Sequence, residues 1–343
     1  MKIIYSDKEL HHHPQYEWNF GKLVPYPEKN IRAKIICDEC NKRGMGDMII
    51  APDSFDVSHI EKVIDPQMVD FIRSSQELNE GESIFPHIFP YRNFTNNGEI
   101  HPEVNKKKSG CYCFDVGIEL DKDSYIAAKA AVDVALTGAQ LIATKAERHV
   151  FALSRPPGHH ASSYHFGGYC IFNNIAIAAY YLAVRFGKVA IIDVDFHHGN
   201  GTQDIFYDQG NVFFASLHGD VHYNYPYFSG FADERGERLG FNTNLNINLP
   251  AGIGDKEYRE YLTKALYEIE KFKPEIILVS LGLDTFKDDP LSDIGLSSSF
   301  YKEMAEIFLK IGMPILAVLE GGYDIKDLAE NGANFIEGLA EGA

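Results

Sequence analysis

Short apolar runs that alternate with helical patterns extend along the whole of this chain. Runs of this length, rich in valine, isoleucine and leucine, are typical of strands buried on both faces of a parallel sheet. Their alternation with helices indicates an α/β fold in which helices cover both faces of one sheet. We therefore predict a mainly parallel sheet of about eight strands. The predicted strands are Lys2–Tyr5, Met48–Ile50, Val150–Ser154, Val189–Val194, Val212–Ser216, Leu245–Leu249, Ile276–Leu281 and Ile315–Leu319.

Helical patterns occupy several of the segments between these runs, and Asp123 and Asp255 stand at positions suited to cap two of them. With 343 residues, of which 45% are hydrophobic, the chain is long enough for one large domain. No internal repeat or low-complexity linker divides it, so we predict a single domain over residues 1–343. The predicted helices are Ser124–Ala146, Asn174–Phe186 and Lys256–Phe272.

One segment, Glu80 to Cys113, matches neither pattern. It contains Pro86, Pro90 and Pro102, several aromatic residues and a run of lysines. A loop of this length inside a compact domain is usually functional. We expect this insertion, at about 80–113, to shape a binding site or an interface. A merely solvated loop is the alternative.

Charge and hydropathy exclude some classes of function. The net charge of −17 argues against nucleic acid as the main partner and favours the approach of a cationic substrate. No apolar run reaches the ~18–20 residues needed to cross a bilayer, so we expect no membrane partner. The first residues predict a strand and lack the apolar core of a signal peptide.

The cysteines and one histidine cluster are interpreted as structural residues without a functional role. The chain has 5 cysteines, without the spacing of a disulfide framework, which suits a reducing compartment; we expect a cytoplasmic protein. Cys37 and Cys40 have the spacing of a zinc knuckle or a redox motif, but no second pair completes a zinc site. They stand in a helical pattern, so we predict structural thiols. We interpret His11–His13 as an ordinary N-terminal turn, with a metal site as the alternative.

The stretch from Asp193 to Gly201 carries the strongest indication of chemistry. It follows the apolar run Val189–Ile192, and side chains at alternate positions of an extended chain face the same side. Asp193, Asp195 and His197 would therefore converge at the end of a strand. Carboxylate and imidazole ligands without a thiolate fit zinc, and also iron(II), cobalt or manganese. The alternative is that Asp193 caps the following turn and the histidines are solvated.

Two further strand ends carry groups suited to catalysis, at the edge where open α/β sheets bind ligands. A rigid, proline-containing turn presents His159 and His160, and adjacent imidazoles suit general acid–base work because their pKa lies near working pH. Asp284 follows another strand. With Asp195 and His197 it would provide three metal ligands and one open position, the pattern of a catalytic zinc site.

The last predicted strand is followed by Glu320-Gly321-Gly322-Tyr323. The two glycines could cradle a phosphate, but no lysine, serine or threonine follows at the spacing of a phosphate-binding loop. The alternative is that the glycines let the chain turn sharply so that Tyr323 reaches the metal. Its hydroxyl could then donate to a developing oxyanion.

Together these segments resemble the arginase–deacetylase superfamily and, within it, the acetylpolyamine amidohydrolases, which are bacterial relatives of the histone deacetylases. The resemblance is in register over the second half of the chain and looser before it. It implies a single α/β domain with an eight-stranded parallel sheet, in agreement with the strands predicted above. The matching segments are Arg155–His160, Gly167–Asn174, Asp193–Tyr207, Phe214–His218, Leu283–Asp284 and Glu320–Tyr323.

The resemblance implies zinc as the cofactor, with Fe²⁺ or Co²⁺ as alternatives. The residues that match its zinc ligands are Asp195, His197 and Asp284. The residues that match its catalytic groups are His159, His160 and Tyr323. Asp193 and Asn200 match the hydrogen-bond partners of the first and the second histidine. An amide beside His160 should hold the pKa of that histidine lower than a carboxylate would, which suits a base that starts neutral.

The resemblance also implies a narrow substrate tunnel and bound potassium. The residues that match the tunnel walls are Gly168, Tyr169 and Tyr225. Those that match a structural K⁺ site beside the zinc, largely through backbone oxygens, are Asp193, Asp195, His197, Ser216 and Leu217. Those that match a second monovalent-ion site are Phe206, Gln209 and Val212.

The implied function is removal of the acetyl group from a small N-acetylated amine, which releases acetate and a primary amine. The insertion resembles the loop that mediates dimerisation in the amidohydrolases, so a homodimer is expected. Polyamine-specific relatives carry acidic residues near the tunnel mouth. Here that region contains Lys106–Lys108, which would repel a polycation if it faced the mouth, and the nearest carboxylates are Glu103, Asp115 and Glu119.

Three other functions remain as alternatives. The first is an acetyl-lysine deacetylase that acts on peptides or proteins. The second is a non-catalytic sensor of acetylated amines. The presence of a suitable residue at every catalytic position argues against it. The third is an arginase-like binuclear manganese enzyme, whose additional metal-bridging carboxylates are not evident.

Overall fold

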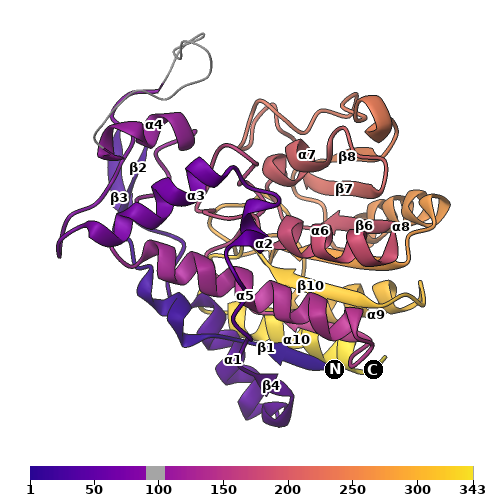
Figure 1. Cartoon of the computed structure of the whole chain (residues 1–343). Coiled ribbons are helices and arrows are strands. Elements are labelled where there is room, and N and C mark those ends of the chain that lie inside the picture. Colours follow the sequence, from indigo (N-terminus) through magenta and orange to yellow (C-terminus); the bar gives the residue numbers. More distant parts are fainter. Residues whose placement is uncertain (90–104, 343) are drawn as a thin grey trace.

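A parallel sheet of eight strands organises the chain (Figure 1). The structure, a computed structural model, describes residues 1–89 and 105–342. The strands lie in the order β4-β1-β5-β10-β9-β6-β7-β8, and neighbouring strands are parallel. This confirms the predicted fold, and each predicted run overlaps one of these strands. Their bounds are β1 Lys2–Ile4, β4 Ile49–Ile50, β5 His149–Ala152, β6 Val189–Asp193, β7 Val212–Gly219, β8 Asn244–Leu249, β9 Ile276–Leu281 and β10 Ile315–Leu319.

Alternate residues along the strands pack into two separate cores, one on each face of the sheet. In β10, Leu316 and Val318 belong to one core, whereas Ile315 and Ala317 belong to the other, and all four are fully buried. Burial on both faces explains why the strands appear in the sequence as continuous apolar runs. The long helices of the first core are α5 Ser124–Ala143 and α6 Asn174–Phe186. Those of the second are α1 Arg32–Lys42, α8 Asp255–Phe272, α9 Ser298–Leu309 and α10 Leu328–Ala340.

The chain also forms shorter helices, and the short α-helices contribute residues to the first core. The α-helices are α2 Ser58–Glu61, α3 Pro66–Arg73, α4 Ser109–Tyr112 and α7 Asn200–Phe206. The 3₁₀ turns are η1 Asp7–His11, η2 Gly46–Met48, η3 Ser74–Glu77, η5 Asn105–Lys108 and η6 Arg238–Gly240.

The three predicted helices are present, with corrections at their ends. Helix α5 stops at Ala143, and Asp123 occupies its N-cap position without a side-chain cap hydrogen bond. Asp255 is not the cap of α8 but its first residue, because Gly254 is the N-cap. The Asp255 carboxylate accepts hydrogen bonds from the backbone N–H and the hydroxyl of Ser297 instead, at 2.9 and 2.7 Å.

Helix α5 is long and apolar enough to cross a membrane by length and composition alone, but 67% of it is buried inside the fold. It packs against α6 and against strands β1 and β5. We therefore regard it as a core helix.

A two-stranded antiparallel hairpin, β2 Tyr16–Asn19 and β3 Lys22–Pro25, was not predicted. Its turn residues Phe20 and Gly21 both have positive φ, at 45° and 80°, as in the tight turns that favour hairpins. Phenylalanine is not a residue typical of such a turn, so the sequence carried no hairpin signal here. Of the four residues of β2, only Glu17 is buried.

Only the two ends of the predicted insertion can be described. Ile84 pairs with Leu120 in an isolated bridge, and the Ser109 hydroxyl donates to the carbonyl oxygen of Phe85 at 3.0 Å. The stretch 90–104, with Pro90, Pro102 and Glu103, lies outside the described residues. Lys107 is exposed and Lys108 half-buried.

The cysteines are free, and Cys37 and Cys40 are buried on α1 as structural thiols. In the histidine cluster, η1 ends at His11, and His12 is buried with its Nδ1 3.0 Å from the Ser124 hydroxyl. This ordinary packing agrees with the interpretation of the segment as an N-terminal turn.

Candidate active site

Four strands that are adjacent in the sheet, β5, β10, β9 and β6, end at the same edge. The loops that follow them carry His159, Tyr323, Asp284 and Asp195 respectively. Parallel pairing is the reason that residues so distant in sequence meet at one edge.

The structure brings Asp195, His197 and Asp284 together. One donor atom of each lies within 4.8 Å of those of the other two. The Nδ1 of His197 lies 2.9 Å from Asp284 Oδ2 and 3.4 Å from Asp195 Oδ1. Both carboxylates are fully buried.

Backbone groups aim both carboxylates. Asp195 accepts hydrogen bonds from the N–H groups of His197 and Gly321, at 2.8 and 2.7 Å. Asp284 accepts one from Phe196 N–H at 2.9 Å. A Cβ atom at Gly321 would lie 2.6 Å from an oxygen of each carboxylate. The glycine is therefore needed to make room for them.

Electrostatics indicate that this cluster fits a divalent cation. Burial and the charge of Asp195 raise the pKa of Asp284 to about 8. Burial alone would lower the pKa of His197, but hydrogen bonds to Asp195 and Asp284 raise it to about 9. Two buried carboxylates so close together hold a proton between them and their imidazole unless a cation takes its place. A set of two oxygens and one nitrogen, without thiolate, suits Zn²⁺, Fe²⁺ or Co²⁺.

The two predicted catalytic histidines lie side by side, with ring centroids 4.1 Å apart, and both are buried. His159 Nδ1 lies 2.9 Å from Asp193 Oδ2, and His160 Nδ1 lies 2.7 Å from Asn200 Oδ1. Because an amide oxygen can only accept, it places the proton of neutral His160 on Nδ1 and leaves Nε2 free to take another.

Their surroundings move the two pKa values in opposite directions. Burial alone would lower the pKa of His159, but the carboxylates of Asp195 and Asp193 raise it to about 10. Burial, together with the charges of His159 and His197, lowers the pKa of His160 well below its ordinary value. His160 is therefore neutral and His159 is charged at neutral pH. Groups whose environments separate their pKa values in this way can divide acid and base roles between them.

A pH profile tests the role of Asn200. Because the pKa of His160 is depressed, the acidic limb of kcat/KM should lie below the ordinary histidine range. In the variant Asn200→Asp a carboxylate stabilises protonated His160, which raises its pKa. The limb should then move to higher pH, by about one unit or more. Asn242→Asp, which adds the same charge at an exposed position, should leave the limb in place. A limb that does not move with Asn200→Asp would mean that His160 is not the titrating base.

Asn200 also contacts a second cavity of about 490 Å³. Among the residues that the structure describes, only His160 lines both this cavity and the substrate cavity described below. Asn200, the hydrogen-bond partner of His160, thus has polar surroundings. A carboxylate introduced there by Asn200→Asp could be hydrated. The cavity is lined by Phe114, His160, Ser162, His165, Asn200, Gln203, Asp204, Tyr207, Ser229 and Glu234.

Contacts to its backbone and to its ring hold Tyr323 in place. Its N–H donates to Asp289 Oδ2 at 2.6 Å, and the guanidinium carbon of Arg32 lies 5.2 Å from its ring centroid. Burial raises the pKa of Tyr323 well above its ordinary value. The phenol therefore stays protonated and can act as a hydrogen-bond donor. Neither Arg32 nor Asp289 carried a local sequence signal for this contact.

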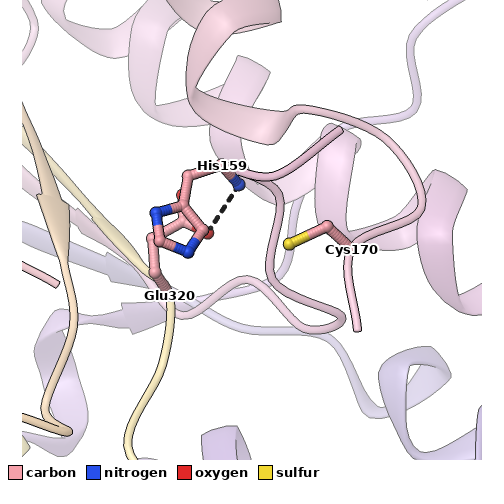
Figure 2. Close-up of side chains that lie close together, drawn as sticks. All are labelled: His159, Cys170 and Glu320. Atoms are coloured by element: carbon pink, nitrogen blue, oxygen red, sulfur yellow. Dashed lines mark hydrogen bonds between the residues drawn. The ribbon is translucent and has the colours of Figure 1, made fainter. Parts of the chain in front are cut away.

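A second group of potential ligands, His159, Cys170 and Glu320, lies beside the site (Figure 2). Glu320 Oε2 accepts hydrogen bonds from the N–H groups of Gly158, at 2.6 Å, and His159, at 3.1 Å, the latter drawn in Figure 2. Burial raises the pKa of the Cys170 thiol well above its ordinary value, which disfavours the thiolate that a metal needs. We therefore interpret Glu320 as a support for the histidine loop and not as a metal ligand.

A cavity of about 360 Å³ leads to these groups. It is lined by His160, His197 and Tyr323 and by the predicted tunnel residues Gly168, Tyr169 and Tyr225. Among the described residues, no lysine or arginine lines it. The other lining residues are Glu17, Trp18, Asn19, Phe20, Asp115, Val116, Gly117, Phe196, Tyr223, Asn224, Tyr227 and Leu291.

Two carboxylates brace the tunnel walls. Asp115 Oδ2 accepts hydrogen bonds from the Tyr225 hydroxyl, at 2.7 Å, and from Gly168 N–H, at 2.9 Å. The Tyr169 hydroxyl donates to Glu17. Of the carboxylates considered from the sequence, Asp115 lines the cavity whereas Glu119 does not. Glu17 was missed because it belongs to the unpredicted hairpin.

The residues matched to the first potassium site lie next to the histidine pair. Ser216 pairs with Asp193 across β6 and β7, and both are fully buried, as is Leu217. The Ser216 hydroxyl lies 2.8 Å from Nδ1 of His218. The second set, Phe206, Gln209 and Val212, spans the connection from α7 to β7. Ion binding by either set stays a prediction.

Comparison with known proteins gives a consistent picture. Residues 26–339 match the histone deacetylase domain. The chain is 40% identical to acetylpolyamine amidohydrolase 2 of Pseudomonas aeruginosa over 99% of its length and 98% of the relative. It is 38% identical to acetylpolyamine amidohydrolase of Mycoplana ramosa over 99% of its length and 100% of the relative. The crystal structure of acetylpolyamine aminohydrolase from Burkholderia pseudomallei has a TM-score of 0.92 at 29% identity, and the match covers 99% of this chain and 98% of that one.

Proposed function

This chain belongs to the histone deacetylase family, and we propose that it is a metal-dependent amide hydrolase that removes acetyl groups from small N-acetylated amines. The products would be acetate and a primary amine. Relatives that match over almost the full length are named acetylpolyamine amidohydrolases, so acetylated polyamines are the first substrates to test.

One observation carries the proposal. His160, His197 and Tyr323 line one cavity. His197 belongs to a cluster suited to a divalent cation, His160 lies against a second histidine whose pKa is shifted in the opposite direction, and the Tyr323 phenol is protonated. These are the groups that amide hydrolysis requires: a site for the carbonyl, a base for the water and a donor for the oxyanion.

We assign Asp195, His197 and Asp284 as ligands of zinc, or of Fe²⁺ or Co²⁺. When bound there, the ion supplies Lewis acidity toward the acetyl carbonyl and acidifies a water molecule. The chain provides the remaining steps. His160, neutral at the start, takes a proton from the attacking water, and the Tyr323 hydroxyl donates to the oxygen that becomes negative. A histidine then protonates the departing amine as the C–N bond breaks.

The cavity favours an amine that carries positive charge. Glu17 and Asp115 are the carboxylates in its lining, and the overall charge of −17 attracts cations. Both oxygens of Asp115 already accept hydrogen bonds within the protein, so Glu17 is the carboxylate better placed to meet a substrate ammonium. Neither Lys107 nor Lys108 lines the cavity, which supports the proposal of a cationic substrate.

Glu17→Gln tests this preference. Glutamine can still accept the hydrogen bond from Tyr169, so the tunnel wall should persist while the charge is lost. For an acetylated diamine we expect KM to rise about tenfold, because a charge-assisted hydrogen bond is lost. For a neutral N-acetylalkylamine of the same length KM should not change. An equal effect on both substrates would mean that Glu17 acts through the tunnel wall and not through its charge.

The second candidate function is an acetyl-lysine deacetylase, because acetyl-lysine presents the same linear amide. A panel of acetylputrescine, acetylspermidine and acetyl-lysine peptides separates the two. We expect the largest kcat/KM for the small acetylated amines. Preference for the peptides would establish the acetyl-lysine deacetylase. Zinc binding without hydrolysis of any member of the panel would favour the non-catalytic sensor of acetylated amines.

We further propose a homodimer whose interface includes the insertion at about 80–113. Large apolar side chains near the cavity support it, since Phe20 is 93% exposed and Phe228 90% exposed. Light scattering should give twice the chain mass of 38.6 kDa. A monomeric mass at all concentrations would refute the dimer.

We also propose a structural K⁺ at the Asp193, Ser216 and Leu217 site, and a cytoplasmic location, which the free cysteines support.

A further inference from the structure

Two loops carry the proposed catalytic groups, and they leave neighbouring strands. The histidine loop, Arg155–His160, follows β5, and the tyrosine turn, Glu320–Tyr323, follows β10, which pairs with β5. The tyrosine turn contains two successive glycines, and Gly322 has a φ of 120°. Glycines leave a turn free to adopt many conformations, so contacts from outside must fix it.

Arg32 of α1 fixes the tyrosine turn. Its Nε donates to the carbonyl oxygen of Gly322 at 2.6 Å, and its Nη2 donates to that of Glu320 at 2.5 Å. The same guanidinium lies against the ring of Tyr323. Because the donors of a guanidinium form a rigid fork, these contacts set the direction of the turn.

Arg155 is the first residue of the histidine loop, and its own side chain anchors that end of the loop. Its Nη1 donates to the carbonyl oxygens of Glu9 and His12, at 2.6 and 2.7 Å. The loop is thereby tied to the N-terminal segment.

Glu28 joins the two arginines. Its Oε1 accepts from Arg155 Nε at 2.8 Å and from Arg32 Nη1 at 2.9 Å, while its Oε2 accepts from Arg155 Nη2 at 2.7 Å. All three side chains are fully buried. Within the part of the chain that the structure describes, no other carboxylate forms an ion pair with either arginine.

Such a network is better suited to set geometry than to add stability. The cost of removing three charges from water offsets most of their mutual attraction, so a buried network of this kind contributes little net free energy. Its hydrogen bonds are directional, however. None of the three side chains lines the cavity, so none contacts the substrate.

We propose that Glu28 is a positioning residue that keeps the tyrosine turn and the histidine loop in register, so that Tyr323 and His160 act on the same carbonyl group. This inference rests on the proposed function. It assigns Glu28 no contact with the reacting atoms.

A double-mutant cycle in the full chain tests the proposal. Glu28→Gln leaves one acceptor oxygen for two guanidinium groups, and Arg32→Lys keeps the charge but loses the fork. Each should lower kcat about 10- to 100-fold, the cost of a small misplacement, with KM within about threefold of the wild type. In a Tyr323→Phe background the same changes should lower kcat by less than about threefold, because residues that act as a unit are not additive.

Arg43→Lys is the matched control. Arg43 lies at the other end of α1 from Arg32, directly after its last residue. Its guanidinium contacts Glu39, Asn334 and Glu337 and neither loop, so kcat should stay unchanged. Full additivity in the cycle, or an effect on KM alone, would overturn the proposal. If Glu28→Gln does not fold, Arg32→Lys completes the cycle by itself.

Hydrogen exchange provides a readout that needs no turnover. In Glu28→Gln, or in Arg32→Lys if the former does not fold, backbone amides of 155–160 and 320–323 should exchange faster than in the wild type. In Arg43→Lys they should not. Unchanged exchange in both segments would overturn the proposal. If the wild type hydrolysed no acetylated amine, the proposed function would fail, whereas the exchange result would still decide the role of Glu28.

Discussion

Tyr323→Phe should lower kcat about 10²- to 10³-fold, the usual cost of removing one donor to an oxyanion. The substitution deletes a single hydroxyl from a buried ring and keeps the contact of that ring with Arg32. Metal content and KM should therefore stay near the wild-type values. Steady-state kinetics on an acetylated amine, together with metal analysis of the same preparation, measure both quantities.

Tyr267→Phe is the control for this experiment. Tyr267 is 58% exposed on α8, and its loss of a hydroxyl should change neither kcat nor KM. Near-normal turnover by Tyr323→Phe would refute the role of this tyrosine. A loss of activity that tracks a loss of metal would show that the substitution acts on the metal cluster instead.

Asp284→Ala should remove both metal binding and activity. The affinity for the metal should fall by more than about 10- to 100-fold, which is the usual loss when only a hydrogen-bond partner of a metal ligand is removed. Because a bound metal stabilises the transition state by several kcal/mol, kcat/KM should fall by at least about 10³-fold. Treatment of the wild type with a chelator should have the same effect, and zinc, Fe²⁺ or Co²⁺ should reverse it.

Thermal stability gives an independent test of the same cluster. In the wild type, chelation should lower Tm, because bound metal stabilises only the folded state. In Asp284→Ala, Tm should respond little to the chelator. Asp208→Ala, which removes an exposed carboxylate, should behave as the wild type does. A chelated wild type with full activity would end the metal proposal.

The sheet and the grouping of Asp195, His197 and Asp284 could be predicted because their signals are local. A strand buried on both faces is a continuous apolar run, and Asp195 and His197 follow such a run directly. Asp284 needed one further step, the rule that parallel strands end at a common edge. Even β4, with two residues at the sheet edge, was found because its run is apolar.

Asp193 and Asn200 were predicted as partners of the two histidines, but the supports formed by Asp115 and Glu28 were not, because each depends on a partner far away in the chain. Asp115 and Tyr225 are 110 residues apart, and Glu28 and Arg155 are 127 residues apart. Nothing in the local pattern of a single carboxylate indicates such a partner. The hairpin was missed for another reason: in β2 the buried residue is Glu17, whereas Tyr16 and Trp18 are exposed, the inverse of the usual pattern.

Trp18 gives the molecule an intrinsic optical reporter. It is the 1 tryptophan of the chain, it lies in the cavity wall, and 51% of its surface is exposed. Its fluorescence should therefore change when an acetylated amine enters. Binding could then be titrated without a label, even in variants that no longer turn over.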